Sequence, residues 1–284
     1  MRLGVITDEV SQNFREALEF AVEFDLDCVE LRSAFEKGPF DYNDVDIKEI
    51  KRLSEEYAIP ITAISSPMFK CDYNAENISK HQEKFKKLIE YTSVIGATKI
   101  RCFDFFKNDN ITSDMIIDAY QKPYELAEKA GITIAIESEP TTNSQCCKDI
   151  AQLVNAFNKH YFKALYDPGN NIYSTDENPY PDGFEFIKDV FCHIHIKDAI
   201  ITPDGAVGEC VGKGLVDYKG LFKHLHKIGY SGDVMLETHY RIPGTEKLND
   251  ATLVNPKGSA ISDNGYEASC VCMEKLKEII KYTK

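Results

Sequence analysis

The chain has 284 residues and a formal net charge of −13, from 33 Lys and Arg against 46 Asp and Glu. An acidic chain without a basic stripe repels a phosphate backbone, so we expect no nucleic-acid partner. Its nine scattered cysteines lack the regular spacing of a disulfide framework. No apolar stretch approaches the roughly 20 residues of a membrane span, so we expect no membrane partner.

The N-terminal segment MRLGVITDEV predicts a strand rather than a secretory signal, which together with the scattered cysteines favours the reducing cytoplasm. A chain of this length can bury a substantial core, and no linker or low-complexity segment interrupts it. We therefore expect a cytoplasmic protein with one domain over residues 1–284.

Short β-branched runs alternate with segments that have apolar residues at helical spacing. The expected strands cover residues 2–7, 28–32, 60–65, 98–103, 132–137, 162–167, 192–196 and 233–237. The expected helices cover residues 13–24, 46–57, 75–95, 113–130, 144–159, 183–190, 218–228 and 266–282. Such alternation closes a barrel more readily than an open sheet, so the sequence predicts an α/β fold with a single (β/α)8 TIM barrel.

Two long connections, residues 168–181 and 241–264, are rich in Gly, Pro, Asn and Ser, and each follows a strand that ends in a polar residue. Long loops in compact domains often line or cover a site, whereas the alternative is a pair of surface insertions. We expect both connections to act as walls or lids over the strand ends.

Four of the expected strands carry metal-ligand side chains at or near their carboxyl ends: Glu137 after ITIAI, Asp167 after FKALY, a histidine of FCHIHIK, and Glu237 after DVML. In a (β/α)8 barrel these ends meet at one face, where catalytic groups of such barrels lie. Three carboxylates and an imidazole suit a hard or borderline divalent ion and leave coordination positions for substrate oxygens. We expect one such ion, with Mn²⁺ first and Mg²⁺, Co²⁺ or Zn²⁺ as alternatives.

These strand ends resemble those of the sugar phosphate isomerases and epimerases of the xylose isomerase-like barrel superfamily. The shared motifs are the Glu that ends the fifth strand, D-P-G-N after the sixth, H-I-K-D in the seventh and L-E-T-H at the eighth. The segment ITDEVSQNFREALEFAVEFDLDCVELR also resembles the first βαβ unit of that family, so the resemblance covers nearly the whole chain. It implies homo-oligomers as well, because barrels of this group commonly associate.

The resemblance implies that the metal ligands are Glu137, Asp167, His195 and Glu237. It also implies that Glu137 and Glu237 serve as the acid/base pair.

The choice of histidine needs the resemblance, because His193 and His195 are two residues apart and point to the same side of a strand. The resembling pattern has its ligand directly before the hydrophobic-Lys-Asp triplet, which selects His195. His193 is then expected deeper in the barrel, hydrogen-bonded to a neighbour.

Four further side chains are expected to contact the substrate: Lys197, Asn170, His239 and Arg101. Lys and Arg are the usual partners of phosphate or carboxylate oxygens, and Lys197 shares the His195 side of its strand. The ketose 3-epimerases of the superfamily carry His where this chain has Asn170 and Glu where it has Asn143, so their substrate does not transfer. The alternative for Arg101, and also for Arg32, is a salt bridge with acids at the rim.

The chemistry that the resemblance implies is proton abstraction next to a carbonyl, with the divalent ion stabilising the enediolate. With two carboxylates beside the sugar, one removes the proton and the other returns it to the opposite face, which is epimerisation; one carboxylate alone would exchange aldose for ketose. The expected substrate is a sugar, sugar phosphate or related keto-polyol.

Three alternatives remain open. A lyase, such as an inosose dehydratase or a keto-glycoside β-eliminating enzyme, begins with the same proton abstraction. A phosphodiesterase like the zinc-dependent AP endonucleases shares the barrel, but it needs further His and Asp ligands. The strands CVELR, ITAIS and KIRCF contain no histidine. A non-catalytic sensor would not need all four ligands.

Overall fold

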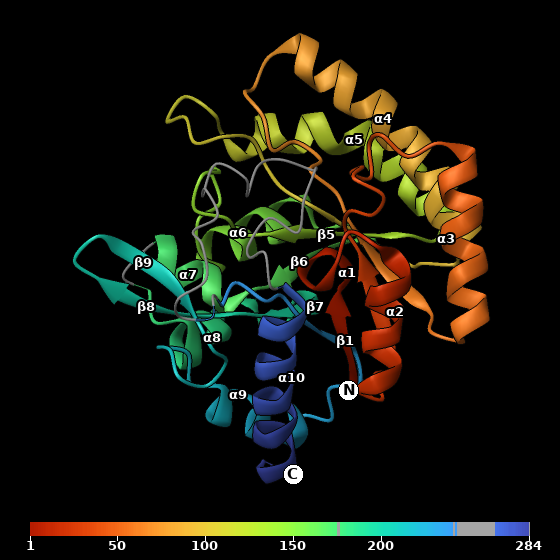
Figure 1. Cartoon of the computed structure of the whole chain (residues 1–284). Helices are drawn as coiled ribbons and strands as arrows, with labels where there is room; N and C mark the ends of the chain where they lie inside the picture. The colour runs from red at the N-terminus through yellow and green to blue at the C-terminus, as the bar shows by residue number, and fades with distance from the viewer. Residues whose placement is uncertain (175–176, 241, 243–264, 284) are drawn as a thin grey trace.

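The computed structural model describes residues 1–174, 177–240, 242 and 265–283. Within them, eight parallel strands form a closed barrel with the order β1-β10-β7-β6-β5-β4-β3-β2, and helices surround it (Figure 1). The predicted (β/α)8 fold class is confirmed. Because the ring runs in chain order and closes between the first and last barrel strands, every described barrel strand end can face one common centre.

The strands of the barrel lie close to the predicted segments: β1 (Arg2–Ile6), β2 (Cys28–Leu31), β3 (Ile61–Ser65), β4 (Lys99–Cys102), β5 (Thr133–Glu137), β6 (Phe162–Tyr166), β7 (Phe191–Ile196) and β10 (Asp233–Leu236). Their hydrogen-bonded register is parallel throughout. It places His195 beside Met235, and Glu137 beside Leu165.

The helices and helical turns are α1 (Thr7–Val10), α2 (Phe14–Glu23), α3 (Asp44–Tyr57), α4 (Ala75–Ile95), α5 (Ser113–Ala130), α6 (Cys147–Phe157), α7 (Pro168–Ser174), η1 (Pro179–Gly183), α8 (Phe184–Ile187), α9 (Tyr218–Lys227) and α10 (Gly265–Tyr282). Several begin at a side chain that accepts a backbone N–H, as at Asn43, Asn74 and Thr112. α4 and α5 end at Gly96 and Gly131, both in the left-handed conformation that glycine adopts readily.

The main apolar core lies between the outside of the barrel and its helices. Phe20 of α2, Phe85 of α4 and Phe222 of α9 are fully buried there. α10, the last helix described, packs against α1 and α9, so the two ends of the chain meet on one side of the barrel (Figure 1). No helix in the described ranges has the length and apolar character to cross a membrane.

The structure corrects the expected connections in two places and leaves a third untested. Residues 168–181 are not a plain loop, because α7 begins directly after Asp167 and η1 follows it. An antiparallel hairpin of β8 (Asp198–Thr202) and β9 (Gly205–Glu209), which was not predicted, projects beyond the barrel (Figure 1). The second expected wall, residues 241–264, lies outside the described residues except for Ile242.

Candidate metal centre

The four predicted metal ligands converge at the carboxyl end of the barrel. Glu137 ends β5, Asp167 follows β6, His195 lies near the end of β7, and Glu237 follows β10. Each offers a ligand atom, and these atoms all lie within 4.8 Å of one another. All four side chains are buried. Three carboxylates and one imidazole at such separations fit a hard or borderline divalent cation.

His195 sits between the two carboxylates proposed as acid and base. Its Nδ1 lies 3.2 Å from Glu137 Oε1 and 3.4 Å from Glu237 Oε2. Nearby carboxylates outweigh the burial that opposes a charge, so the pKa of His195 is raised well above its ordinary value. These two distances show that Nδ1, rather than Nε2, is the nitrogen that faces the ligand set.

Lys197 lies inside the ligand set rather than at its edge. Its Nζ is 2.8 Å from Asp167 Oδ2 and 2.9 Å from Glu237 Oε2. Although burial disfavours the ammonium, these carboxylates raise the pKa of Lys197, so it stays charged at neutral pH. The ammonium offsets part of the negative charge of Glu137 and Glu237, whereas burial raises the pKa of Asp167 to about 8.

Arg101 and Asn170 both contact Glu137. Arg101 Nε is 3.3 Å from Glu137 Oε2, and the Asn170 amide donates to Glu137 Oε1 at 3.2 Å and to the Ser138 carbonyl at 2.8 Å. Burial alone would raise the pKa of Glu137, but Arg101 and His195 bring it down to about 2. Glu137 is thus a carboxylate at neutral pH, as a proton acceptor must be.

Asn143, the other departure from the ketose 3-epimerases, does not join the cluster. Its amide donates to the carbonyl of Phe105 at 2.9 Å and holds the loop after β4.

The rim beside Glu237 is a network of charged residues. Arg32 NH1 donates to Glu237 Oε1 at 2.7 Å, and the same guanidinium contacts Asp8 and Glu9 at the start of α1. His239 Nε2 lies 3.4 Å from Glu237 Oε1, and burial lowers the pKa of His239 to about 4. The salt-bridge alternative for Arg32 is therefore what the structure shows, with the predicted base Glu237 as one partner.

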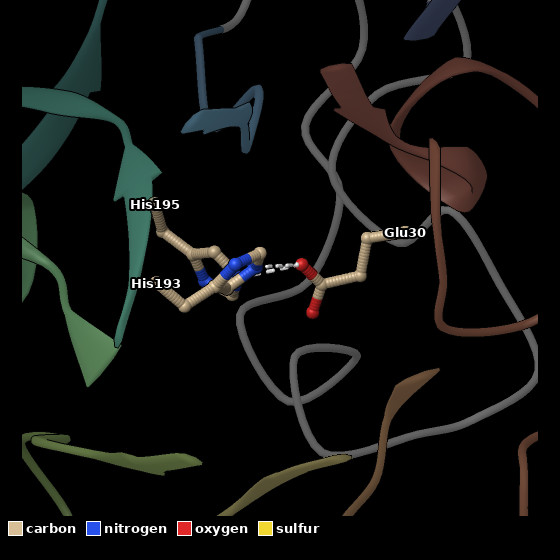
Figure 2. Close-up of side chains that lie close together, drawn as sticks. All are labelled: Glu30, His193 and His195. Carbon is tan, nitrogen blue, oxygen red and sulfur yellow. Dashed lines mark hydrogen bonds and ion pairs between the residues drawn. The ribbon is translucent and has the colours of Figure 1, made fainter. Parts of the chain in front are cut away.

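A second cluster lies below the four ligands. Figure 2 shows Glu30 of β2 facing His193 and His195 of β7. Glu30 Oε2 is 2.6 Å from His193 Nε2 and 3.1 Å from His195 Nε2. His193 is fully buried and hydrogen-bonded to a neighbour, as the sequence predicted.

Residues 18–258 match the sequence model of a protein family described as the xylose isomerase-like TIM barrel. The chain belongs to this family. The match covers most of the barrel, and it extends from α2 past the strand that precedes Glu237.

Known proteins similar to this xylose isomerase-like barrel include enzymes of sugar chemistry. An inosose dehydratase of Geobacillus thermodenitrificans is 23% identical over 168 residues, which are 54% of this chain and 53% of that protein, so the alignment spans about half of this curated relative. The solved IolI protein with a bound zinc atom is 16% identical, with a TM-score of 0.77, and the comparison covers 100% of this chain and 99% of that one. D-psicose 3-epimerase of Clostridium cellulolyticum H10, solved with D-tagatose, is 14% identical, with a TM-score of 0.73 over 100% and 98% of the two chains.

Sequence reasoning missed three acidic residues of this family member's centre: Asp8, Glu9 and Glu30. The signals were present, because T-D-E directly follows the first strand and Glu30 interrupts the apolar run CVEL. A charged residue inside a buried strand is uncommon unless a partner compensates it. Glu30 lies on the same side of β2 as Arg32, which the period of two residues could have indicated.

The D-P-G-N motif needs glycine at its third position for a steric reason. A Cβ added to Gly169 would lie 2.5 Å from the carbonyl oxygen of Lys197 and would also collide with that lysine's side chain. The start of α7 therefore packs directly on Lys197, the residue between β7 and β8, whose ammonium reaches Asp167.

We expect Gly169→Ala to destabilise the fold by about 1–3 kcal/mol, the usual cost of overpacking a tight contact. The measurement is the free energy of unfolding in denaturant, followed by circular dichroism. Divalent-ion affinity should fall as well, because the clash displaces Lys197 next to Asp167. An unchanged unfolding midpoint would contradict the close packing of α7 on Lys197.

Proposed function

We propose that this xylose isomerase-like barrel is a divalent-metal-dependent isomerase or epimerase of a sugar, sugar phosphate or related keto-polyol. The observation that carries the proposal is the convergence of Glu137, Asp167, His195 and Glu237 at the carboxyl end of the barrel. Barrels of this type hold their active sites at that end. The family membership and the sugar enzymes among the similar proteins support the same class.

We propose these four side chains as ligands of one divalent ion. An oxygen-rich set favours Mn²⁺ or Mg²⁺, and the zinc atom of the IolI protein makes Zn²⁺ a candidate to test beside them. When bound, such an ion polarises adjacent carbonyl and hydroxyl oxygens of a substrate.

The proton-transfer step is assigned to Glu137 and Glu237. Their strands, β5 and β10, are separated around the barrel by β6 and β7, so the two carboxylates approach the centre from different directions. The pKa of each is lowered despite burial, Glu137 by Arg101 and His195, and Glu237 mainly by Lys197. Both are therefore ionised at neutral pH, which is the form that a proton acceptor needs.

We propose that Lys197, Asn170, His239 and Arg101 bind the substrate or orient the acid/base pair. Asn170 and Arg101 contact Glu137, whereas Lys197 and His239 contact Glu237. Glu237 also contacts the Arg32 guanidinium. Each carboxylate thus has at least one cationic neighbour and a further polar neighbour, which hold it in place.

The second candidate is a lyase, and the similarity to an inosose dehydratase favours it. Dehydration of a keto-inositol begins with the same abstraction of a proton next to a carbonyl, and then a hydroxyl leaves. The same two carboxylates could serve both reactions, so the substrate decides between them.

The test is a screen of ketoses, ketose phosphates, inososes and 3-keto-glycosides with Mn²⁺ or Zn²⁺ in deuterated water, followed by NMR. For an isomerase or epimerase we expect deuterium at a carbon next to the carbonyl, together with an isomeric product. Loss of water or of an aglycone with a true substrate would identify the lyase. Failure of every compound to exchange a proton or react would count against both candidates.

A further inference from the structure

Glu30 lies at the floor of the centre, and none of the roles proposed above includes it. It is fully buried, and both of its carboxylate oxygens have partners. Oε2 faces His193 Nε2 and His195 Nε2, while Oε1 accepts a hydrogen bond from the Ser65 hydroxyl. A carboxylate so deep in a barrel is costly to bury, and these contacts compensate it.

We propose that Glu30 is a positioning residue that accepts the Nε2 proton of His195 and thereby directs the Nδ1 lone pair into the ligand set. This inference rests on the proposed metal site and names a residue on which that site depends. Glu30 itself would not touch the ion.

The orientation of the His195 ring supports this role. Nε2 points down to Glu30 at 3.1 Å, and Nδ1 points up to Glu137 at 3.2 Å. A neutral imidazole carries one proton, so a partner that holds this proton on Nε2 leaves Nδ1 free as a ligand. Histidines that bind metals usually donate their other N–H to a carboxylate or carbonyl in this way, which fixes the ring and raises its basicity.

Glu30 can fix the ring because it is fixed itself. His193 holds Oε2 at 2.6 Å, and Ser65 holds Oε1 from the neighbouring strand β3. Ser65 also accepts a hydrogen bond from Arg101 Nε at 3.2 Å. A continuous chain of contacts thus runs from Arg101 through Ser65 and Glu30 to His195. It links two of the residues that contact Glu137.

The same three residues, Glu30, His193 and His195, could also be considered as a separate metal site. Two ring nitrogens share one carboxylate oxygen at separations of 2.6 and 3.1 Å, which are hydrogen-bond distances. His195 Nε2 cannot donate a proton to Glu30 and bind an ion at once. We therefore propose that Glu30 and His193 orient the His195 ring and do not bind a second ion.

The test compares Glu30→Gln with Asp233→Asn in the full chain. Glutamine keeps the size of Glu30 but removes the charge. Asp233 is also a fully buried carboxylate, and its Oδ2 lies 4.0 Å from Nδ1 of His193, the ring nitrogen that does not face Glu30. Among the described residues it makes no contact with His195. Its amide variant is therefore a matched control. Circular dichroism confirms that each variant is folded before Zn²⁺ and Mn²⁺ affinities are measured by calorimetry.

We expect Glu30→Gln to weaken ion binding about 10- to 100-fold, the usual cost of losing a partner behind a metal-binding histidine. Asp233→Asn should leave the affinity unchanged. Wild-type affinity in Glu30→Gln would overturn the positioning role, and so would an equal loss in both variants.

A second measurement needs no variant that has to fold. In zinc-loaded wild-type protein with ¹⁵N-labelled histidine, NMR should show His195 protonated on Nε2, with that proton protected from exchange. Protonation on Nδ1 would overturn the proposal. Two bound ions per chain, one of them lost in Glu30→Gln, would make the cluster a metal site and also overturn it. If the wild-type chain binds no ion, the proposed function fails together with this inference. If the wild-type chain binds the ion and Glu30→Gln binds it with the same affinity, this inference alone is refuted.

Discussion

Replacing Asp167 or His195 by alanine should abolish tight binding of the single divalent ion expected per chain. Each change removes a ligand from the buried set, and the loss of affinity should exceed the about 100-fold that the loss of an outer hydrogen-bond partner can cost. Elemental analysis after metal loading gives the stoichiometry, and calorimetry gives the affinity.

His193→Ala is the matched control for His195→Ala, because both residues lie buried on the same side of β7. His193→Ala should retain the ion with a much smaller loss of affinity than His195→Ala, since Ser65 still holds Glu30 and Glu30 still faces His195. Full binding in Asp167→Ala and His195→Ala would show that the ligand set is wrong. Loss of binding in His193→Ala alone would move the site two residues down β7.

Glu137→Gln and Glu237→Gln should each keep a measurable fraction of the bound ion and lose turnover by about 10²- to 10⁴-fold. A carboxamide can still offer an oxygen to the ion, but it cannot accept a proton as a base. The measurements are the metal content and kcat with a substrate found in the screen. Deuterium exchange at the reacting carbon is followed in parallel.

Glu139→Gln is the control for these amide variants. Glu139 lies two residues after Glu137 but turns to Lys70, at 3.0 Å, so its substitution should leave turnover unchanged. In an epimerase with two bases, one amide variant should still exchange the proton on one face while inversion is blocked. Wild-type turnover in both Glu137→Gln and Glu237→Gln would exclude proton transfer by these carboxylates.

The cationic side chains around the two proposed bases also matter for these tests. Lys197 contacts Glu237 and Asp167, and Arg32 contacts Glu237 from the rim. Removing one partner of a buried pair leaves the other charge without compensation. Substitutions of Lys197 or Arg32 would therefore change folding and chemistry together, which makes the amide variants of the carboxylates the cleaner experiment.

The sequence alone determined the class of fold and the residues at the strand ends. Periods of two and of about 3.6 residues identify strands and helices, and their alternation specifies a parallel barrel. Because parallel strands share a carboxyl end, the positions of Glu137, Asp167, Glu237 and a histidine of β7 in their own segments were enough to predict that they meet. The choice of His195 over His193 came from the resemblance to the family. This prediction needs only the periodicity of each segment and the place of each residue within it.

Only the tertiary structure decided what each of these residues contacts. A period of two tells which side of a strand a residue occupies, but the stagger of strands around a closed barrel sets which residues stand at the same height. Glu30 of β2 therefore meets His195 of β7 across the interior, although 165 positions separate them, and Arg32 reaches Glu237. The β8–β9 hairpin and α7 likewise depend on packing at the barrel mouth, where short segments lack a period of their own. Alternation along one strand is a local property, whereas height in the barrel follows from closing all of its strands together.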